Sequence, residues 1–424
     1  MNRYSAKTVF LIAAFWVSIL TSSAAFGKWD SHPRAVGMGG AYSALARDFE
    51  APEWNPANLG LSDGSRASVN IISGGFTVNN NSFTVSDYIK YNGEFLDESD
   101  KDKILASIPA SGLAVDLSAE VSALDLSIGN IAFTYGVHGS SSFFIDRDPI
   151  KLLLLGNAVT HEATLSSTRG EAIALADLAA SWGHVVRRWA GGELAVGGTL
   201  HYLQGLEYSK VVESVGGVST TEGGFEGSGH LTLHSSHGGV GYSADAGLAA
   251  RFGDGWRFSV SWRNAISRLY WGKRNEERIL SFEMQPVTLE QSSQDPDRDS
   301  PVSTKDSSYS YGSFSSRLAP VIRLGIAKSC RKTTWSVDWE QALIEGPCQG
   351  VSPGVAVGLE YVPRSFLPLR AGLAFGGDRQ PRFSGGFGIH SGPYEFDMGA
   401  AKAETPLPVD TRGLTVAFSF SLRF

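Results

Sequence analysis

The final twelve residues of the chain alternate between apolar and polar side chains. In the segment GLTVAFSFSLRF, residues 413–424, every second residue from Leu414 onward is large and apolar. A period of two residues is the signature of a β-strand with one apolar face. The last strand of a soluble β-sandwich and a strand of a membrane β-barrel both fit this pattern.

The same alternation recurs upstream, in strand pairs joined by tight turns. One pair covers 240–252 and 256–262 around a Gly-Asp-Gly turn, and another flanks the turn at 129–130. These runs exceed the usual 5–6 residues of strands in globular sheets and match the roughly 9–11 residues that a tilted membrane strand needs. We therefore predict an all-β fold, a transmembrane antiparallel β-barrel.

Short and long connections alternate along the chain, as they do in outer-membrane barrels, where turns face the periplasm and long loops face outward. With Phe424 on the periplasmic side, every short turn falls in the periplasm. A first strand at about 66–77 brings the total to about fourteen, an even number as expected. The barrel is predicted over 63–424, with long external loops at 78–111, 139–170, 210–238 and 267–318.

The predicted strand order places opposite charges across from each other on the lumenal side of the wall. Such pairs stabilise an antiparallel ladder. The simpler interpretation is that they brace the barrel wall, because ion pairs of this kind usually need no functional account; the alternative is a polar ladder along a conduit. The predicted pairs are Glu360 with Arg370, Asp245 with Arg263, and Arg323 with Asp338.

The first 25 residues resemble a secretory signal peptide. Arg3 and Lys7 precede a 12-residue apolar run from Val9 to Leu20, which is too short to span a bilayer as a helix. Export together with the strand pattern predicts a bacterial outer-membrane location, with membrane lipid around the barrel. A net charge of −7 argues against a nucleic-acid partner.

The segment 26–62 is predicted to be a plug inside the barrel. The run AYSALA at 41–46 is small, apolar and helical in propensity. Asn55-Pro56 is a helix start, with asparagine as the cap and proline in the first turn. A barrel of about fourteen strands encloses more space than its wall side chains fill, so a small helix can occupy it. A soluble N-terminal helix docked on a sheet is the alternative.

Residues 34–60, RAVGMGGAYSALARDFEAPEWNPANLG, resemble the N-terminal segment of FadL/TodX-type outer-membrane proteins, a family of channels for long-chain fatty acids and aromatic hydrocarbons. The similarity rests on the run GMGGAY at 37–42, on Asp48 and on Asn-Pro-Ala at 55–57. Segments 100–117 and 148–157 resemble a FadL-like branch allied to the PorV-type proteins of bacterial secretion systems.

The resemblance implies roles for particular residues. A hatch across the lumen would include Gly37, Met38, Gly39, Gly40, Tyr42, Asn55, Pro56 and Ala57. External loop helices would form a groove for an apolar ligand from Ile104, Leu105, Ile108, Leu152, Leu153, Leu154 and Leu155. The terminal strand would present Phe420, Leu422 and Phe424 to the barrel-assembly machinery. The kink in a wall strand that provides a lateral exit in this family is not identifiable from the sequence.

No enzymatic site, metal site or cofactor is predicted, because the sequence has no nucleophile elbow, P-loop or His-Glu-x-x-His run. His230, His234 and His237 come closest to a cluster, but His237 does not share a strand face with the other two, which favours a solvated loop. Cys330 and Cys348 are separated by a whole strand, about 25 Å at ~3.3 Å per residue, so no disulfide is expected between them.

Two functions remain open. The first is passive uptake of hydrophobic small molecules, such as long-chain fatty acids, without a cofactor. The second is a non-transport scaffold that holds a secreted or surface protein partner. A continuous apolar path past Met38 and Tyr42 would favour transport, whereas a lumen sealed by ion pairs would favour the scaffold.

Overall fold

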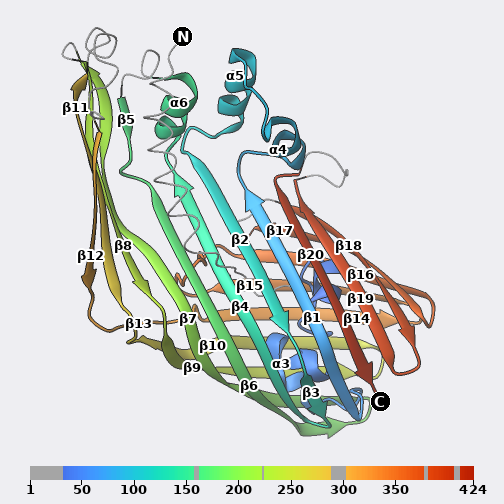
Figure 1. The fold of residues 1–424 in the computed structure, drawn as a ribbon. Helices are drawn as coiled ribbons and strands as arrows, with labels where there is room; N and C mark the ends of the chain where they lie inside the picture. The colour runs from blue at the N-terminus through green and yellow to red at the C-terminus, as the bar shows by residue number, and fades with distance from the viewer. Residues whose placement is uncertain (1–31, 157–161, 222–223, 288–301, 377–380, 405–410) are drawn as a thin grey trace.

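The computed structural model describes residues 32–156, 162–221, 224–287, 302–376, 381–404 and 411–424. The predicted signal peptide lies outside these residues. Within them, the chain forms one closed antiparallel β-barrel with several short helices inside it and at one end (Figure 1).

Fourteen strands make the barrel, which confirms the predicted fold class. Each strand pairs with the next, and β1 (Ala67–Asn80) closes the ring against β20 (Gly413–Arg423). β2 (Leu113–Ser122) and β3 (Asp125–Ile128) act as one barrel strand, because both pair with β1 and with β4. The remaining barrel strands are β4 (Ile131–Ile145), β6 (Arg169–Trp189), β7 (Gly192–Thr221), β9 (Gly239–Phe252), β10 (Trp256–Trp271), β14 (Val321–Cys330), β15 (Thr333–Ala342), β16 (Gly354–Arg364), β17 (Leu367–Gly376), β18 (Arg382–Ser391) and β19 (Tyr394–Ala403).

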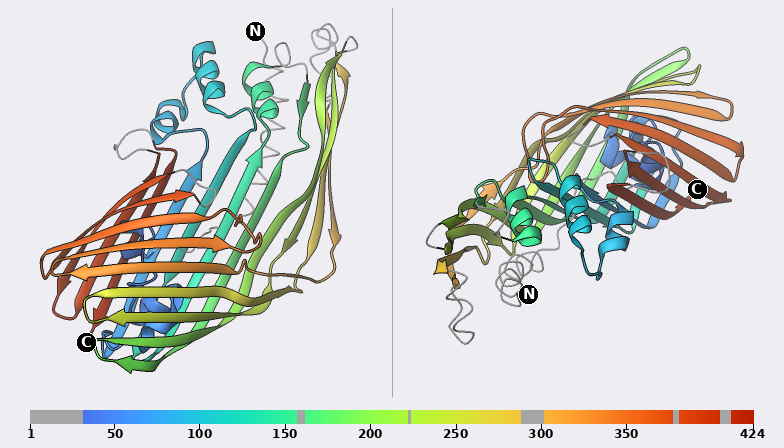
Figure 2. Two further views of the ribbon diagram at one scale, coloured as in Figure 1. Left: turned by 180° about the vertical axis from the view of Figure 1, so that it is seen from behind. Right: turned by 90° about the horizontal axis from the view of Figure 1, so that it is seen from above.

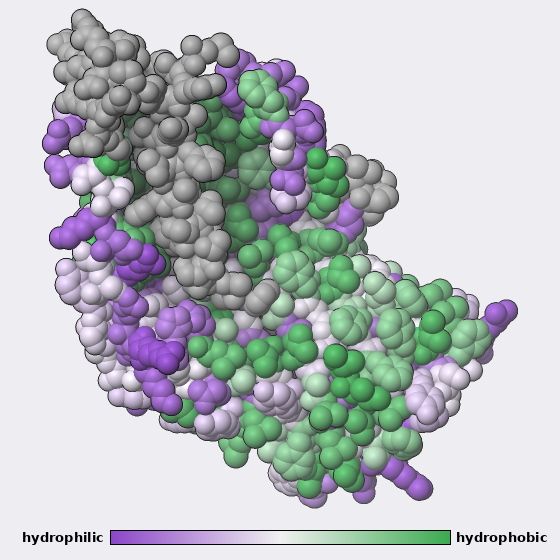
Figure 3. Space-filling view, viewed as in Figure 1, coloured by the Kyte–Doolittle hydropathy of each residue, from purple (hydrophilic) through white to green (hydrophobic). Residues whose placement is uncertain are grey.

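The alternating sequence explains which face of each strand meets the surroundings. On β20 the outward-facing Leu414 and Phe418 are exposed, whereas the intervening Thr415 and Ser419 are buried in the lumen. The same pattern around the ring gives the barrel an apolar outer surface, much of it visible in Figure 3. An outward apolar band over a polar interior is the arrangement of a barrel in a lipid bilayer.

Connections at one end of the barrel are tight turns. β6 and β7 are joined through Gly191 (φ 85°), β9 and β10 through Gly255 (φ 90°), and β14 and β15 through Arg331 (φ 52°). Positive φ in such short turns is the conformation that glycine adopts without strain. Because short turns are periplasmic in outer-membrane barrels, we refer to this end as the periplasmic end.

The other end carries helices inside the predicted external loops. The segment 78–111 holds α4 (Val85–Tyr91) and α5 (Glu98–Ser107), and α6 (Arg147–Leu155) follows β4. None of the described helices is long and apolar enough to cross a membrane.

The predicted loops at 210–238 and 267–318 are largely β-structure. The outer half of β7 continues past the barrel and pairs with β5 (Glu162–Thr164) and β8 (Gly224–Ser236). β11 (Glu276–Val287) adds to β8, and β12 (Val302–Ser310) adds to β11. These strands form an outer sheet that stands beyond the barrel rim (Figures 1 and 2). The short β13 (Phe314–Ser316) pairs with the outer end of β10.

The N-terminal segment lies inside the barrel as a plug (Figure 2). It consists of four short helices, α2 (Pro33–Gly37), η1 (Asp48–Glu50), α3 (Ala51–Trp54) and η2 (Pro56–Gly60). The helix predicted at 41–46 was wrong, because that segment is a turn. Gly39 and Gly40 take positive φ values after α2, and the N–H groups of Tyr42 and Ser43 donate to Asp338 of the wall at 3.1 and 2.8 Å instead of continuing a helix.

Candidate functional site: the plugged lumen

Asn55 fixes one end of the plug to the wall. Its side-chain oxygen accepts a hydrogen bond from Ala57 N (3.0 Å), which confirms the predicted cap before Pro56. Its amide nitrogen donates to Leu248 O (2.9 Å) and to Ser259 Oγ (2.7 Å) on the barrel strands. The side chain is fully buried. This one residue therefore caps η2 and hydrogen-bonds to the wall strands β9 and β10.

Replacing Asn55 with alanine is therefore expected to cost about 2–3 kcal/mol of unfolding free energy, the sum of a lost cap and of wall groups left unpaired. Denaturant unfolding in detergent micelles measures this. The matched control is Thr84→Ala, which removes the cap of the external helix α4 and should cost about 1 kcal/mol or less. Equal losses in both variants would contradict the anchoring role.

Glycines in the wall let the plug backbone approach closely. A Cβ added at Gly372 would lie 2.2 Å from the carbonyl carbon of Met38, and one at Gly358 would lie 2.7 Å from Met38 Cβ. Gly358 and Gly372 are direct partners in the β16–β17 ladder. Together they form a flat patch of wall that only glycine allows, and the Gly-Met-Gly segment of the plug rests on it.

Arginine side chains join the plug to the wall electrostatically. Arg423 of β20 lies 2.8 Å from Asp48 and 2.9 Å from Glu50 of the plug, and 2.8 Å from Glu395 of β19. Burial by itself raises the pKa of the Glu50 carboxyl, but Arg423, followed by His32 and Arg34, holds that pKa well below its ordinary value. Glu50 therefore remains ionised and keeps its ion pairs at physiological pH.

Arg370 is the centre of the adjoining wall network. Its Nε donates to Glu360 (2.7 Å), its direct ladder partner, and its Nη1 donates to Asp397 (2.6 Å). The Arg370 side chain is fully buried. Arg34 of α2 reaches both Glu50 and Glu360 at 3.7 Å, which connects this wall network to the plug.

The other two predicted pairs differ from the observed ladders. Arg323 was predicted opposite Asp338, but its ladder partner is Glu340, to which it donates at 2.5 Å. The β14–β15 turn lies one residue later than predicted, which moves the partner by two positions and keeps it on the same face. Asp245 and Arg263 are not ladder partners, because the β9–β10 ladder shifts register after Trp262. Both residues instead line the inner cavity described below.

An outer cavity of about 450 Å³ opens in the lumen beyond the plug. Its wall combines the aromatic rings of Phe143 and Phe144 with the cationic side chains of Arg169 and Lys210. The Arg169 guanidinium lies 4.0 Å from the centre of the Phe144 ring. Its remaining lining includes the segment between β15 and β16, where Glu345, Gly346, Cys348 and Gln349 face inward. The carboxylates of Asp116, Glu171 and Glu340 also line it. The cavity is therefore amphipathic, with apolar surface beside side chains of both charges.

Two smaller cavities continue from the outer cavity toward the plug. A connecting space of about 30 Å³ shares Ser140 and Gln349 with the outer cavity. An inner cavity of about 70 Å³ shares His138, Arg263 and Asn264 with the connecting space. The three spaces therefore adjoin one another along the inner face of β4, and we call this row the chain of cavities.

Most residues that line the inner cavity are charged or polar. Across it, His201 bridges two carboxylates, with Nδ1 at 2.9 Å from Asp177 and Nε2 at 3.2 Å from Asp245. Its remaining lining includes plug and wall residues, among them His32, Phe49, Glu50, Glu53, Ser73, Glu120, Ser122, Asp125, Thr134 and His138.

The barrel wall is interrupted beside the inner cavity, between β2 and β3. The ladder to β1 stops at Ser73↔Ser122 and resumes at Asn70↔Asp125. Between them Leu124 has a φ of 60°, which is unusual for a residue other than glycine. The sequence analysis missed this break in the wall. The local sequence marks it only where Ala-Leu-Asp at 123–125 interrupts the alternation of apolar and polar residues.

Side chains replace the missing backbone ladder at this wall break. Asp125 accepts hydrogen bonds from Asn70 Nδ2 (2.7 Å), from the Tyr135 N–H (2.9 Å) and from Ser122 Oγ. Asn70 also donates to Ser73 Oγ (2.9 Å). Asp125 and Ser122 line the inner cavity, so this polar cluster lies between the cavity and the gap in the ladder. One backbone hydrogen bond, from Ala123 N to Tyr135 O (3.2 Å), also spans this step.

The structure places the other sequence-predicted residues as follows. Met38 and Tyr42 are buried together with Trp54 inside the plug, and they line none of the three cavities of the chain along β4. Ile104, Leu105 and Ile108 are buried near α6, whose Arg147 donates to Leu105 O (2.8 Å). On α6 Leu153 is exposed, and Leu152, Leu154 and Leu155 are half-buried. Phe420 and Phe424 are exposed on β20 and beyond it, and Leu422 is half-buried.

The histidines and cysteines of the sequence analysis are not brought together. His230 and His234 lie on the strand β8 rather than in a loop, and each faces a different glutamate, Glu213 at 3.2 Å and Glu277 at 2.9 Å. Cys330, at the periplasmic end of β14, and Cys348, against Glu171 on the outer side, are both free thiols.

Comparison with known proteins supports the same architecture. Residues 56–233 match a family model described as a family of unknown function, DUF5723. No curated protein matches the sequence. The resemblance to PorV-type proteins stays a prediction.

Among solved structures, the toluene transporter TbuX of Ralstonia pickettii is 12% identical, with a TM-score of 0.55, and the alignment covers 93% of this chain and 99% of that one. The toluene transporter TodX of P. putida is 10% identical (TM-score 0.54, coverage 94% and 99%). A FadL homologue of Pseudomonas aeruginosa is 11% identical (TM-score 0.52, coverage 95% and 100%).

At such low identity, the similarity extends to the fold, and it spans nearly the whole length of both chains. The apolar outer belt, the closed ring of strands and the plug agree with it, and such a barrel indicates the outer membrane of a bacterium. The chain has the fold of a FadL/TodX-type outer-membrane β-barrel.

Proposed function

We propose that this barrel is a passive channel for amphipathic or hydrophobic small molecules, of which long-chain fatty acids are the model case. The observation that carries the proposal is the chain of three cavities along β4, which begins at the outer cavity and ends at the wall break. This route avoids Met38 and Tyr42, so it is not the path past the plug that the sequence analysis named as evidence for transport.

The outer cavity suits an amphipathic molecule, because aromatic rings lie beside charged side chains of both signs. Phe143 and Phe144 offer an apolar surface, and burial on it yields roughly 25 cal/mol per Å². Arg169 and Lys210 offer positive charge to a carboxylate beside that surface. Lys210 lies 3.3 Å from Glu171, so an incoming carboxylate would compete with an existing pair.

Exit at the wall break explains how the ligand could leave while the plug stays in place. At the break the ladder to β1 is replaced by side-chain hydrogen bonds around Asp125. These bonds can open without unpairing a continuous strand. Leu124 and Ile72 are exposed on the outward side of this gap. A molecule that passed Asp125 would reach the apolar face of the barrel and the membrane.

A reversible cross-link tests this route. In a Cys330→Ser, Cys348→Ser background, Ser73→Cys with Ser122→Cys places two thiols on direct ladder partners at the edge of the break. Neighbouring positions of an antiparallel pair lie within the Cα spacing that a disulfide spans. Oxidation is expected to reduce uptake of radiolabelled oleate to the level of cells without the protein, and reduction should restore it.

The control cross-link joins Ala327→Cys and Ser336→Cys, which are partners in the β14–β15 ladder, are buried on the lumenal face and line none of the three cavities. It should leave uptake unchanged. Equal uptake through oxidised and reduced forms of the Ser73–Ser122 variant would overturn exit at the wall break. Oleate uptake no faster than in cells lacking the protein would overturn the channel itself.

One observation favours the second candidate function, a scaffold for a surface or secreted partner. Among the described strands, β12 pairs with β11 alone, and most of its residues are exposed. An open strand edge is a template for adding a strand from another protein. If the channel fails the uptake test, the scaffold function predicts that a co-purifying partner is lost when residues 276–310 are deleted.

A further inference from the structure

Two arginines lie on the outside of the barrel wall near its outer end. Arg268 of β10 is exposed and shares the outward face of that strand with the exposed Tyr270, whereas Leu269 between them is buried. Arg317 follows β13 and is also exposed, and its neighbour Leu318 is buried. Both arginine side chains therefore face outward, on the apolar surface of the barrel.

The two arginines are neighbours on adjacent strands. On one side of them Leu269 pairs with Ser316, and on the other side Ser267 Oγ donates to the carbonyl oxygen of the residue after Arg317 at 3.0 Å. Arg268 and Arg317 lie between these two contacts, one on each segment. Like charges across neighbouring strands destabilise the pairing. An anion bound between the two guanidinium groups would remove that cost.

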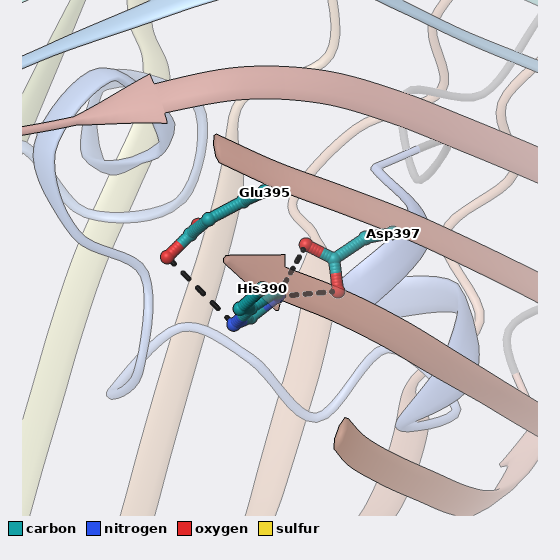
Figure 4. A group of neighbouring side chains, drawn as sticks. All are labelled: His390, Glu395 and Asp397. Carbon is teal, nitrogen blue, oxygen red and sulfur yellow. Dashed lines mark hydrogen bonds and ion pairs between the residues drawn. The ribbon is translucent and has the colours of Figure 1, made fainter. Parts of the chain in front are cut away.

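Other charged groups of the wall find partners within the chain. Lys328, which also faces outward but at the periplasmic end, donates to Asp254 O (2.6 Å) and to Asp254 Oδ2 (3.2 Å). His390 has Asp397 at Nε2 (3.2 Å) and Glu395 at Nδ1 (3.8 Å), as Figure 4 shows. Among the residues that the structure describes, none forms an ion pair or a hydrogen bond with either guanidinium group of the outer pair.

The surroundings of the pair are those of a membrane interface. Tyr242 is the ladder partner of Arg268, Tyr202 is the ladder partner of Tyr242, and Tyr270 lies two residues after Arg268. All three tyrosines are about half exposed on the outside of the wall. Tyrosine is enriched where the apolar core of a membrane meets the lipid headgroups. The outward faces of β9 and β10 carry no carboxylate.

Positive charge continues from the pair toward the rim. Lys273 and Arg274 follow β10 in the connection to β11, and both are exposed. The next carboxylates along the chain, Glu276 and Glu277, belong to the outer sheet, where Glu277 is paired with His234 at 2.9 Å. The segment that leaves the membrane surface thus carries cations before it carries acids.

The height of the pair above the periplasmic turns matches that of lipid headgroups. Phe252 ends β9 at the periplasmic end, and Tyr242 lies ten residues before it. At ~3.3 Å per residue and a strand tilt of about 40°, ten residues rise roughly 25 Å. The apolar band of outer-membrane barrels is also about 25 Å tall. Arg268, opposite Tyr242, therefore lies at the outer edge of the band.

We propose that Arg268 and Arg317 bind the phosphate group of a lipid in the outer leaflet, whose acyl chains lie against the apolar wall below. A guanidinium group offers paired N–H donors that match phosphate oxygens. One phosphate would satisfy donors of both arginines and offset their mutual repulsion. The site is on the outside of the wall, so it does not depend on the proposed transport route.

Lipid binding to the full barrel tests the proposal. Protein in detergent is mixed with lipid A that carries two phosphates, or with dephosphorylated lipid A, and bound lipid is counted by native mass spectrometry. We expect one tightly bound phosphorylated lipid per chain. Arg268→Gln combined with Arg317→Gln should weaken that binding more than about tenfold, because charge-assisted hydrogen bonds are the strong ones. Dephosphorylated lipid A should bind wild type and variant equally weakly.

Lys328→Gln is the matched control, because it removes a positive charge from the same outward surface at a place where the chain itself supplies the partners. It should bind the phosphorylated lipid like the wild type. Heat-modifiable migration on gels verifies that each variant is a folded barrel. Equal binding by the folded double arginine variant, or no preference for the phosphorylated lipid, would overturn the proposal. Displacement of the lipid by inorganic phosphate alone would likewise overturn it, because the ligand would then be a free anion.

Discussion

Replacing Arg370 with methionine is expected to lower the unfolding free energy of the barrel by about 3–5 kcal/mol, the usual cost of removing one partner of a buried ion pair. Arg370 is fully buried and holds both Glu360 and Asp397, at 2.7 and 2.6 Å. Methionine keeps much of the side-chain volume but leaves two carboxylates without their guanidinium. Denaturant unfolding in lipid vesicles, followed by gel mobility, measures the loss.

The control for this prediction is Arg278→Met on the outer sheet. Arg278 makes a two-pronged pair with Asp306, but both side chains are about half-exposed. Exposed ion pairs contribute about 0–1 kcal/mol, so this variant should change stability little. Adding Asp397→Asn to Arg370→Met should recover part of the loss, because one unpaired charge disappears. If Arg370→Met and Arg278→Met had equal effects, the buried network would not be what joins the strands.

A methyl group at Gly372 is expected to displace the plug. The new Cβ would meet the Met38 carbonyl carbon at 2.2 Å and Gly39 N at 2.3 Å, far inside van der Waals contact. Backbone atoms cannot rotate away as a side-chain end can, so the plug segment at 37–40 has to shift. Overpacking of this kind costs about 1–3 kcal/mol, and here it should also open the lumen. We expect Gly372→Ala to raise ion conductance in planar bilayers.

The matched control is Gly385→Ala on the neighbouring strand β18. A Cβ at Gly385 would meet only Arg370 O, at 3.8 Å, which is an ordinary contact. Its conductance should equal that of the wild type. Should Gly372→Ala conduct no more than Gly385→Ala, the plug would tolerate the shift without opening, and the close approach at Gly372 would be a matter of packing alone.

The sequence alone determined the barrel strands, most of their turns and the faces of their side chains, whereas it placed the outer strands β8, β11 and β12 in loops. The reason is that the two-residue alternation of apolar and polar side chains is visible in each short segment. With an apolar outer belt and a polar lumen, only one register of each strand places its apolar residues outward. The cap at Asn55 was equally local, since it needs only an asparagine before a proline. The pair of Glu360 and Arg370 was predicted by counting residues outward from the short turn between their strands. The same count gave the wrong partner for Arg323, because the β14–β15 turn lies one residue later than we predicted.

Only the tertiary structure decided how the plug sits and where the wall opens. Residues 41–46 form a turn because Asp338, almost 300 residues later, captures the N–H groups of Tyr42 and Ser43. The break between β2 and β3 is stabilised by Asp125 and Asn70, which are 55 residues apart in the chain. Such contacts depend on which strands the closed ring places side by side, and a local pattern of apolar and polar residues carries no record of them.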